Sequence, residues 1–395
     1  MAHALAAGGA FTCALHTEGG TVLPYCWGAN AKGQLGIGKE SDPVATNSKP
    51  VLIGNLSGAK IIGVSAGGAH ACAWTDSGKA KCWGDNAKAQ LGYGELDPHS
   101  SPPTAVALAS VDFSMTSMSL GYSHSCALGS KGARCWGSNT EGELGLGISD
   151  DPVGDKPSDL ASLPETFIGG TTLQVSIGKN STCLVTTEGA LSCYGIGPVA
   201  GLGLAASVGK VPNEVGSNTA KLDLGGKVRE VATGYEHACA ILDDGSVKCW
   251  GNNTLGQLGS AALEAGITLA ANTSLAAVPL GAKALTISAG GGTTCAIVEG
   301  GRVKCWGNNA SGQLGLGNKS PDQSTADAVA KRVPFLVREQ RVVGLAVGTQ
   351  HVCASVEGGN IYCWGENDNG QLGVTTSGDI GDEAGEMEAL ISVDL

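Results

Sequence analysis

The sequence predicts an all-β protein built from seven copies of one structural unit that close into a ring. One motif, most complete at residues 237–259, recurs along the whole chain of 395 residues. The second cysteines of successive copies lie 53 to 58 residues apart, a period typical of a supersecondary repeat. Glycine is abundant, with 63 residues, and aromatic residues make up only 4%. This balance is expected where many short strands alternate with glycine-bearing turns.

Each unit is predicted to contain four short strands, and the second unit shows them most plainly. Residues 49–53 form an extended segment after a proline, and residues 60–65 alternate into a second strand. Residues 70–75 and 79–83 form a third and a fourth strand, which the turn Asp76-Ser77-Gly78 joins. No amphipathic helical period separates these segments, which favours an all-β repeat.

The fourteen cysteines form seven local pairs across the third and fourth strands. If Cys72 opposes Cys82, the midpoint falls at Ser77, and opposed Cα atoms about 4.5 to 5.5 Å apart permit a disulfide. Zinc is disfavoured, because no Cys-x-x-Cys is present and each pair supplies only two ligands. We interpret the pairs as disulfides, each stabilising the fold by about 2 to 3 kcal/mol, with buried free thiols as the alternative. The pairs are Cys13 with Cys26, Cys72 with Cys82, Cys126 with Cys135, Cys183 with Cys193, Cys239 with Cys249, Cys295 with Cys305, and Cys353 with Cys363.

The pattern Trp-Gly-x-Asn-x-x-Gly-Gln-Leu-Gly follows the hairpin in six units. We expect the tryptophans to pack between neighbouring sheets and the glycines to allow tight turns. The first unit departs from the pattern through a longer predicted hairpin loop over residues 18–24. The fourth unit is degenerate, with Tyr194 in place of tryptophan. The tryptophans of the pattern are Trp27, Trp83, Trp136, Trp250, Trp306 and Trp364.

The two ends of the chain are predicted to meet. Residues 390–395 resemble the strand at 220–224, and residues 4–13 match residues 231–239. We therefore expect the C-terminal strand to complete a sheet begun by the N-terminal strands, which leaves no exposed sheet edge. Residues 1–395 then form a single domain, with repeat hairpins near residues 10–36, 69–92, 123–145, 180–203, 236–259, 292–315 and 350–373.

The motif His-x-Cys-Ala with the following Cys-Trp-Gly-x-Asn-x-x-Gly-Gln-Leu-Gly, at residues 237–259, resembles the regulator of chromosome condensation repeat. The resemblance covers essentially the whole chain and implies a seven-bladed β-propeller with four-stranded antiparallel blades. Members of that family include a guanine-nucleotide exchange factor, photoreceptors that use packed tryptophans, and a bacterial enzyme inhibitor. Because only Trp74 lies outside the repeat position, a light-sensing tryptophan cluster has no support. The paired cysteines are similar to bacterial extracytoplasmic variants of the repeat.

Composition argues against several classes of partner. The formal net charge is -12, and no cluster of lysine and arginine is present, so nucleic acid is a poor partner. No apolar run approaches the length of about 20 residues that spans a membrane. The start Met1-Ala-His-Ala-Leu lacks the features of a secretory signal. With disulfides as the interpretation, we expect an extracellular, periplasmic or cell-surface location, although no signal peptide is present in this sequence.

No residue of the sequence is predicted to be catalytic, to bind a cofactor or to ligate a metal. His70, His124, His237 and His351 share one repeat position, which Phe11 occupies in the first unit, so a packing or hydrogen-bonding role is favoured. The acidic loops at 150–159 and 379–383 match no EF-hand, and whether they bind calcium stays open. Phosphate-loop, dinucleotide-binding and nucleophile-elbow motifs are missing.

The functional hypothesis is therefore a non-catalytic scaffold. We expect a monomer that binds a protein or glycan through the non-repeating loops of one face. Tyr93, Tyr122 and Tyr235 break the repeat consensus and are the candidate anchors, because rigid aromatic residues dominate binding hot spots. The alternative is an intracellular guanine-nucleotide exchange factor for a small GTPase, which would need reduced cysteines.

Overall fold

The fold is described from a computed structural model of the whole chain. It describes residues 5–44, 51, 59–99, 115–130, 132–166, 168–203, 206–260, 268–270, 275–320, 340–376 and 378–395.

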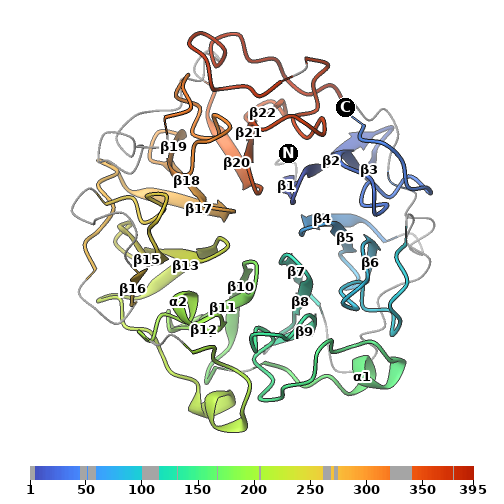
Figure 1. Cartoon of the computed structure of the whole chain (residues 1–395), viewed down its shortest axis with the longest axis vertical. Helices are drawn as coiled ribbons and strands as arrows, with labels where there is room; N and C mark the ends of the chain where they lie inside the picture. Colours follow the sequence, from blue (N-terminus) through green and yellow to red (C-terminus); the bar gives the residue numbers. More distant parts are fainter. Residues whose placement is uncertain are drawn as a thin grey trace.

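Seven antiparallel sheets surround a central axis (Figure 1), which confirms the predicted number of units. We number these blades one to seven along the chain. Each blade has an inner, a middle and an outer strand in chain order. The inner strands are β1 (Leu5–Ala7), β4 (Ile61–Ala66), β7 (Ser117–Leu120), β10 (Thr172–Ile177), β13 (Val228–Thr233), β17 (Ala284–Gly290) and β20 (Val342–Val347).

The middle and outer strands carry the repeated motif. The middle strands are β2 (Phe11–Glu18), β5 (His70–Thr75), β8 (His124–Leu128), β11 (Ser181–Thr186), β14 (His237–Leu242), β18 (Thr293–Val298) and β21 (His351–Val356). The outer strands are β3 (Thr21–Gly28), β6 (Ala80–Gly84), β9 (Ala133–Gly137), β12 (Leu191–Gly195), β15 (Val247–Asn252), β19 (Arg302–Gly307) and β22 (Ile361–Gly365).

The hairpin register agrees with the sequence prediction in every blade. Cys72 pairs with Cys82 across β5 and β6, and the other six cysteine pairs oppose each other in the same way. The structure joins each pair as a disulfide, with Cα atoms 4.0 to 4.1 Å apart. These distances are shorter than the range expected for an average antiparallel pair.

The first blade differs from the prediction of a longer loop. Strands β2 and β3 stay paired as far as Glu18 opposite Thr21, so only Gly19 and Gly20 form the turn. Both glycines have positive φ angles of 56° and 85°, which suits a two-residue hairpin turn. The additional residues therefore lengthen the strands rather than the loop.

The first of the four predicted strands of each unit is weaker than expected and joins the preceding blade. Among the described residues only blade five has a fourth strand, β16 (Thr268–Leu269), which pairs with β15. Single backbone bonds also attach connecting segments to the outer strands of blades one, five and seven. Val51 N donates to Pro24 O, Val278 N to Val247 O, and Val393 N to Ile361 O. Each segment thus adds to the blade before it in the chain.

The ring consequently closes in a different way from the one predicted. The C-terminal segment adds to β22 of blade seven rather than completing blade one. Its Val393 side chain packs in a cluster with Trp27 of blade one, so the two ends meet through side chains. Sequence spacing alone could not show whether a short extended segment pairs with the hairpin before it or after it.

The six repeated tryptophans are fully buried and join neighbouring blades, as predicted. Each indole Nε1 donates to a backbone carbonyl of the preceding blade at 2.9 to 3.0 Å: Trp27 to Gln371, Trp83 to Gln34, Trp136 to Gln90, Trp250 to Val199, Trp306 to Gln257, and Trp364 to Gln313. A Cβ on Gly36, Gly259 or Gly373 would lie 2.7 to 2.9 Å from the next indole. The glycine that ends Gln-Leu-Gly is therefore required by the tryptophan.

The four repeated histidines form a second set of bonds between blades. Each Nε2 pairs with a hydroxyl of the following blade at 2.7 to 3.0 Å: His70 with Ser125, His124 with Thr182, His237 with Thr294, and His351 with Thr12. The last bond joins blade seven to blade one. It contributes to ring closure without any exchange of strands.

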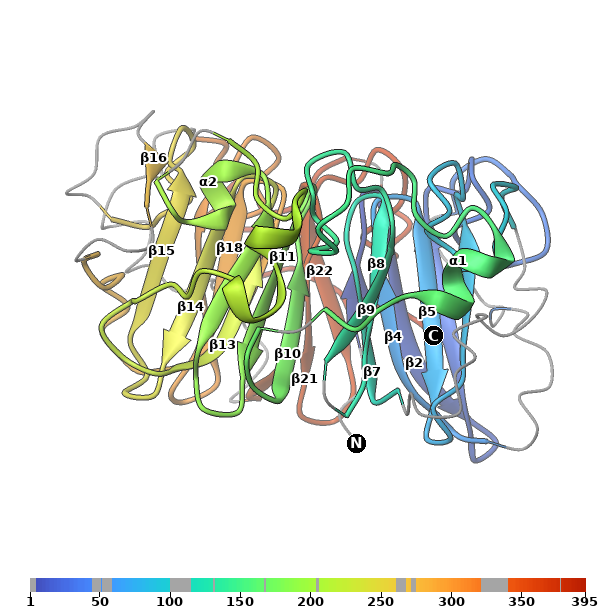
Figure 2. The ribbon, with the colours of Figure 1, turned by 90° about the horizontal axis from the view of Figure 1, so that it is seen from below.

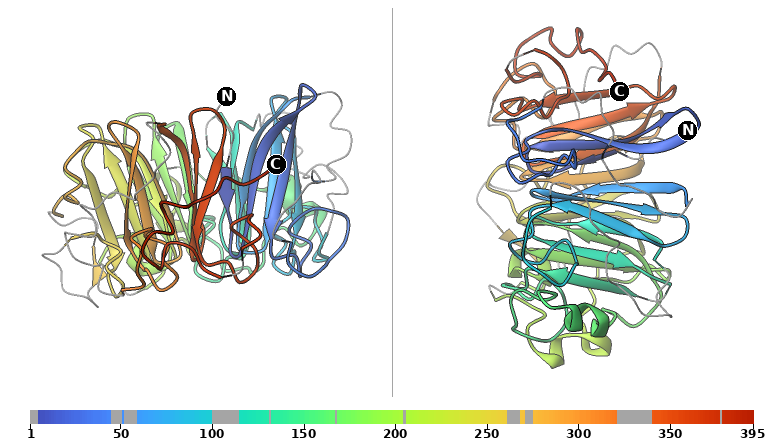
Figure 3. Two further views of the ribbon diagram at one scale, coloured as in Figure 1. Left: turned by 90° about the horizontal axis from the view of Figure 1, so that it is seen from above. Right: turned by 90° about the vertical axis from the view of Figure 1, so that its right-hand side faces the viewer.

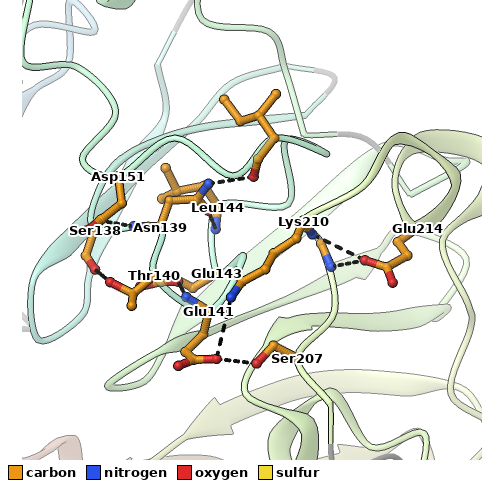
Figure 4. A network of polar contacts seen from close by, with 12 residues as sticks. Ser138, Asn139, Thr140, Glu141, Glu143, Leu144, Asp151, Ser207, Lys210 and Glu214 are labelled. Carbon is orange, nitrogen blue, oxygen red and sulfur yellow. Dashed lines mark hydrogen bonds and ion pairs between the residues drawn. The ribbon is translucent and has the colours of Figure 1, made fainter.

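The loops after the outer strands are ordered by side-chain contacts, as the network of blades three and four shows (Figure 4). The Asn139 side chain accepts a bond from Leu144 N at 3.3 Å, which holds the turn. The Glu141 carboxylate accepts a bond from the Ser207 hydroxyl and lies 4.0 Å from Lys210 Nζ. Contacts of this kind fix the position of one loop against the next around the ring.

The helices are short and lie in the connecting loops. They are α1 (Pro157–Ser162), α2 (Gly197–Ala200) and two single 3-10 turns, Pro212–Glu214 and Gly216–Asn218. Helix α2 occupies the place of the degenerate motif in blade four, and Val199 in it still supplies the carbonyl for Trp250. No helix in the described part of the chain has the length and apolar character that crossing a bilayer requires.

Candidate functional site

The ring presents two faces, which Figures 2 and 3 show edge-on. We call one of them the inner-turn face. It carries the turns that join each inner strand to its middle strand, and also the Trp-Gly-x-Asn loops. On the other, the hairpin-turn face, the middle strands turn into the outer strands and the inner strands begin. A small open hollow lies on the axis at the inner-turn face and is lined by the turns of all seven blades; we call its opening the mouth.

A ring of glycines forms the narrow part of this mouth. One glycine ends the inner strand or directly follows it in every blade: Gly8, Gly67, Gly121, Gly178, Gly234, Gly290 and Gly348. A Cβ on Gly178 would lie 2.2 Å from the Gly234 carbonyl oxygen. Backbone bonds also run from blade to blade here, for example from Tyr235 N to Gly291 O at 2.9 Å. The glycines therefore allow the seven turns to approach the axis.

Three large side chains from consecutive blades stand at this mouth, directly after the glycine ring. They are Tyr122 of blade three, Lys179 of blade four and Tyr235 of blade five, which we call the mouth cluster. The two tyrosine rings pack edge to face with centroids 5.9 Å apart. Lys179 Nζ lies 5.7 Å from the Tyr122 ring centroid and 5.4 Å from that of Tyr235. The other blades carry glycine or threonine at this position, so the cluster makes one side of the mouth aromatic.

The cluster combines a fixed part and an accessible part. The Tyr235 hydroxyl bonds to Thr349 Oγ1 across the mouth at 2.7 Å, and burial is the main cause that raises the Tyr235 pKa. Tyr122 is 46% exposed. No carboxylate in the described ranges lies within ion-pair distance of Lys179. The exposed Tyr122 ring and the accessible Lys179 ammonium thus pack against Tyr235, which its hydrogen bond holds in place. This arrangement is suited to binding.

Tyr93 lies elsewhere, so the structure does not bring the three predicted anchors together. Its hydroxyl donates to Cys82 O at 2.6 Å and accepts from Cys82 N at 3.0 Å. Its ring packs edge-on against His99. The side chain covers the outer strand of blade two, and burial raises its pKa well above the ordinary value. Tyr93 is therefore assigned to packing.

The four repeated histidines lie behind the glycine ring and are buried. A Cβ on Gly67, Gly234 or Gly348 would lie 2.2 to 2.4 Å from Cε1 of the histidine three residues later. Burial lowers the pKa of His70 and His124 to about 3 and that of His237 and His351 to about 4. The neutral rings are enclosed between blades, in keeping with a packing role.

The acidic loops are engaged with neighbouring blades. Lys88 pairs with Asp151 at 2.7 Å, and Lys319 lies 3.2 Å from Asp379 and 2.7 Å from Asp382. Within the described ranges no group of three histidine, cysteine, aspartate or glutamate residues is placed to hold a metal ion.

Sequence reasoning missed Lys179. The signal was present, because Lys179 occupies the position directly after the repeated glycine, as Tyr122 and Tyr235 do. A search for aromatic departures from the repeat could not find a lysine, and only the structure shows that the three positions converge on the axis.

The comparison with known proteins agrees with this architecture. The family model described as the RCC1-like domain matches residues 23–390. The chain belongs to the RCC1-like domain family. The ultraviolet-B receptor UVR8 of Arabidopsis thaliana is 30% identical over 361 residues, which cover 89% of this chain and 75% of the receptor. The human E3 ubiquitin-protein ligase HERC2 is 27% identical over 91% of this chain, which spans only 7% of that ligase.

Two solved structures share the fold. Human WBSCR16 superposes with a TM-score of 0.72 at 21% identity, covering 93% of both chains. Prp20p of Saccharomyces cerevisiae, studied for its binding to Gsp1p and histones, gives a TM-score of 0.72 at 20% identity over 98% of this chain and 86% of its own. These likenesses support an RCC1-like propeller as the architecture that carries the mouth cluster.

Proposed function

We propose that this RCC1-like propeller is a non-catalytic scaffold that binds a protein through its inner-turn face. The observation that carries the proposal is the convergence of Tyr122, Lys179 and Tyr235 beside the axial hollow. The buried histidines bond neighbouring blades, and each disulfide joins two strands of one blade. The mouth cluster is therefore the part of this face not explained by folding.

A protein partner suits this cluster better than a glycan. Sugars bind aromatic side chains by stacking on an open ring face, but Lys179 covers one face of both tyrosines. The hollow is lined mainly by glycine and aliphatic residues, which can receive an apolar side chain of a partner. The accessible Lys179 ammonium can pair with a carboxylate beside that side chain. An apolar anchor next to an acidic residue is the recognition element that this geometry favours.

The proposed location is extracytoplasmic, and the seven disulfides support it, because such bonds persist in oxidising compartments. The alternative, an intracellular exchange factor acting on a small GTPase, would require fourteen reduced cysteines. All fourteen cysteines are buried in the folded chain.

The first experiment tests the mouth cluster. We expect Tyr122→Ala combined with Lys179→Ala to reduce capture of partner proteins from a host extract at least tenfold, because both accessible members of the cluster are lost. Immobilised wild-type and variant proteins are compared by quantitative mass spectrometry. Leu96→Ala is the matched control, since Leu96 is 45% exposed and lies outside the mouth. Equal capture by wild type and variant would place the binding surface elsewhere.

The second experiment tests the proposed compartment. Protein purified from its native host is denatured without reductant and treated with an alkylating agent. We expect fewer than two of the fourteen cysteines to be labelled before reduction and all fourteen afterwards. Complete labelling before reduction would reject the disulfides in the cell and favour the intracellular alternative.

A further inference from the structure

The inner strands share an irregularity at the hairpin-turn face. In five blades the pairing of inner and middle strands skips one residue near the start of the inner strand. The skipped residues are Ile62, Leu173, Arg229, Leu285 and Val343. They occupy one repeat position, five residues before the glycine of the mouth. A β-bulge leaves the additional residue unpaired and redirects its side chain.

Four of these bulged residues are large, aliphatic and exposed. The exposed fractions are 47% for Ile62, 51% for Leu173, 49% for Leu285 and 43% for Val343. We call these four the bulge collar, because they lie at the start of inner strands that surround the axis (Figure 1). Single exposed aliphatic residues are ordinary on protein surfaces, but repetition at one structural position indicates an interaction surface.

A basic residue stands two positions before the bulged residue in four blades. These residues are Lys60, Lys227, Lys283 and Arg341, and all four are exposed. Within the described part of the chain, none has a carboxylate within ion-pair distance. The collar is therefore bordered by cations that can form ion pairs with a partner.

Carboxylates alternate with these cations. The hairpin turn of the same blade places an acidic residue beside each one, through a backbone bond of 2.9 to 3.0 Å from the acidic residue to the basic one: Asp76 to Lys60, Asp243 to Lys227, Glu299 to Lys283, and Glu357 to Arg341. The turn of the preceding blade also touches the cation, since a Cβ on Gly245 would lie 2.7 Å from Lys283 Cβ. Positive and negative charges thus lie next to one another beside the apolar collar in blades two, five, six and seven.

This alternation bears on the identity of the partner. A partner surface of one charge sign would meet as much repulsion as attraction here. In a two-fold contact between identical surfaces, each contact occurs twice: a residue of one copy meets a different residue of the second copy, and the reverse contact forms as well. A surface that carries both signs around an apolar centre is complementary to a rotated copy of itself.

We propose that two copies of this chain associate through their hairpin-turn faces, with the bulge collars in contact and the flanking charges paired between copies. This arrangement differs from the monomer expected from sequence. It leaves the mouth cluster on the outer side of each copy, so the dimer presents two equal binding faces.

The test compares the oligomeric state of three proteins by sedimentation equilibrium, over chain concentrations from about 1 to 100 µM. We expect the wild type to have twice the chain mass. Leu173→Arg combined with Leu285→Arg should raise the dimer dissociation constant at least a hundredfold, because like charges would meet at the collar. Arginine fits at this position in the folded chain, since Arg229 occupies the same bulge in blade five.

The matched control is Leu255→Arg combined with Ile391→Arg. These residues are 41% and 52% exposed and lie outside the collar, so this variant gains the same charge and should stay dimeric. Higher salt should weaken the wild-type dimer, because its charge pairs are screened. A wild type that is monomeric throughout the range overturns the proposal. A collar variant as dimeric as the control, or a dimer that only Tyr122→Ala dissociates, would also overturn it.

Discussion

Replacing Trp136 with alanine is expected to lower the free energy of unfolding by about 3 to 5 kcal/mol, the range measured for a large buried aromatic side chain. Trp136 has no exposed surface, and its Nε1 donates to Gln90 O at 3.0 Å. The substitution removes apolar contacts between blades two and three and one of the two hydrogen bonds to that carbonyl, which keeps its bond from Ser125 Oγ at 2.8 Å. Denaturation by guanidinium chloride under non-reducing conditions measures the change.

The chain itself provides the matched control for this prediction. Tyr194 occupies the tryptophan position in blade four and is also fully buried. Trp136→Tyr should therefore retain most of the packing and cost clearly less than Trp136→Ala. Equal losses for the two variants would show that the contribution does not come from aromatic packing between the blades.

Lowering the pH from 7 to 5 is expected to destabilise the fold through the four repeated histidines. Burial lowers their folded-state pKa from about 6.5 to about 3 for His70 and His124, and to about 4 for His237 and His351. At pH values between the folded-state and the unfolded-state pKa, these histidines are protonated in the unfolded chain and neutral in the folded chain. The stability present above pH 6.5 is therefore lost as the pH falls toward 4. Each histidine contributes a slope of at most about 1.4 kcal/mol per pH unit.

His351→Phe tests this assignment, because Phe11 occupies the same repeat position in blade one. Thr12 still donates to Gln371 O at 2.9 Å, so removal of the imidazole leaves the Thr12 hydroxyl with a partner. We measure the free energy of unfolding of the variant from pH 4 to 7. Its slope against pH should be smaller than that of the wild type by up to about 1.4 kcal/mol per pH unit, which corresponds to one proton. An unchanged slope would mean that His351 titrates alike in the folded and unfolded states.

The hairpins show how much of the fold could be predicted from sequence. Cys72 and Cys82 were placed opposite each other because the midpoint between them falls in a turn, and the structure has this register. The prediction succeeds because a hairpin is local, and its register follows from the turn and the two-residue period of the strands. The burial of the tryptophans was likewise expected from the repetition of one large apolar residue.

Pairing between distant segments could not be predicted in the same way. Residues 390–395 were expected on blade one, but Val393 bonds to Ile361 of blade seven. A short segment with apolar residues fits the edge of either blade, and its sequence contains no preference for one. The choice depends on the path that the connecting loop takes across the surface.

The candidate site was predicted only in part. Tyr122 and Tyr235 were identified because they depart from the repeat, and they meet edge to face at the axis. Tyr93 departs equally, yet its hydroxyl is bound to the backbone of Cys82. A departure from the repeat shows that the fold does not require the consensus residue at that position. Where the new side chain points depends on the loop or turn that carries it.

The sequence by itself determined the number of blades, the disulfide pairing and the tryptophan positions, because each follows from contacts within or between copies of one local unit. Only the tertiary structure decided how the ring closes, and that the turns of blades three, four and five bring Tyr122, Lys179 and Tyr235 together beside the axial hollow. It also showed that the bulged residues form a collar at the opposite face. These features arise because closing seven similar blades around one axis brings equivalent positions together, whatever their separation along the chain.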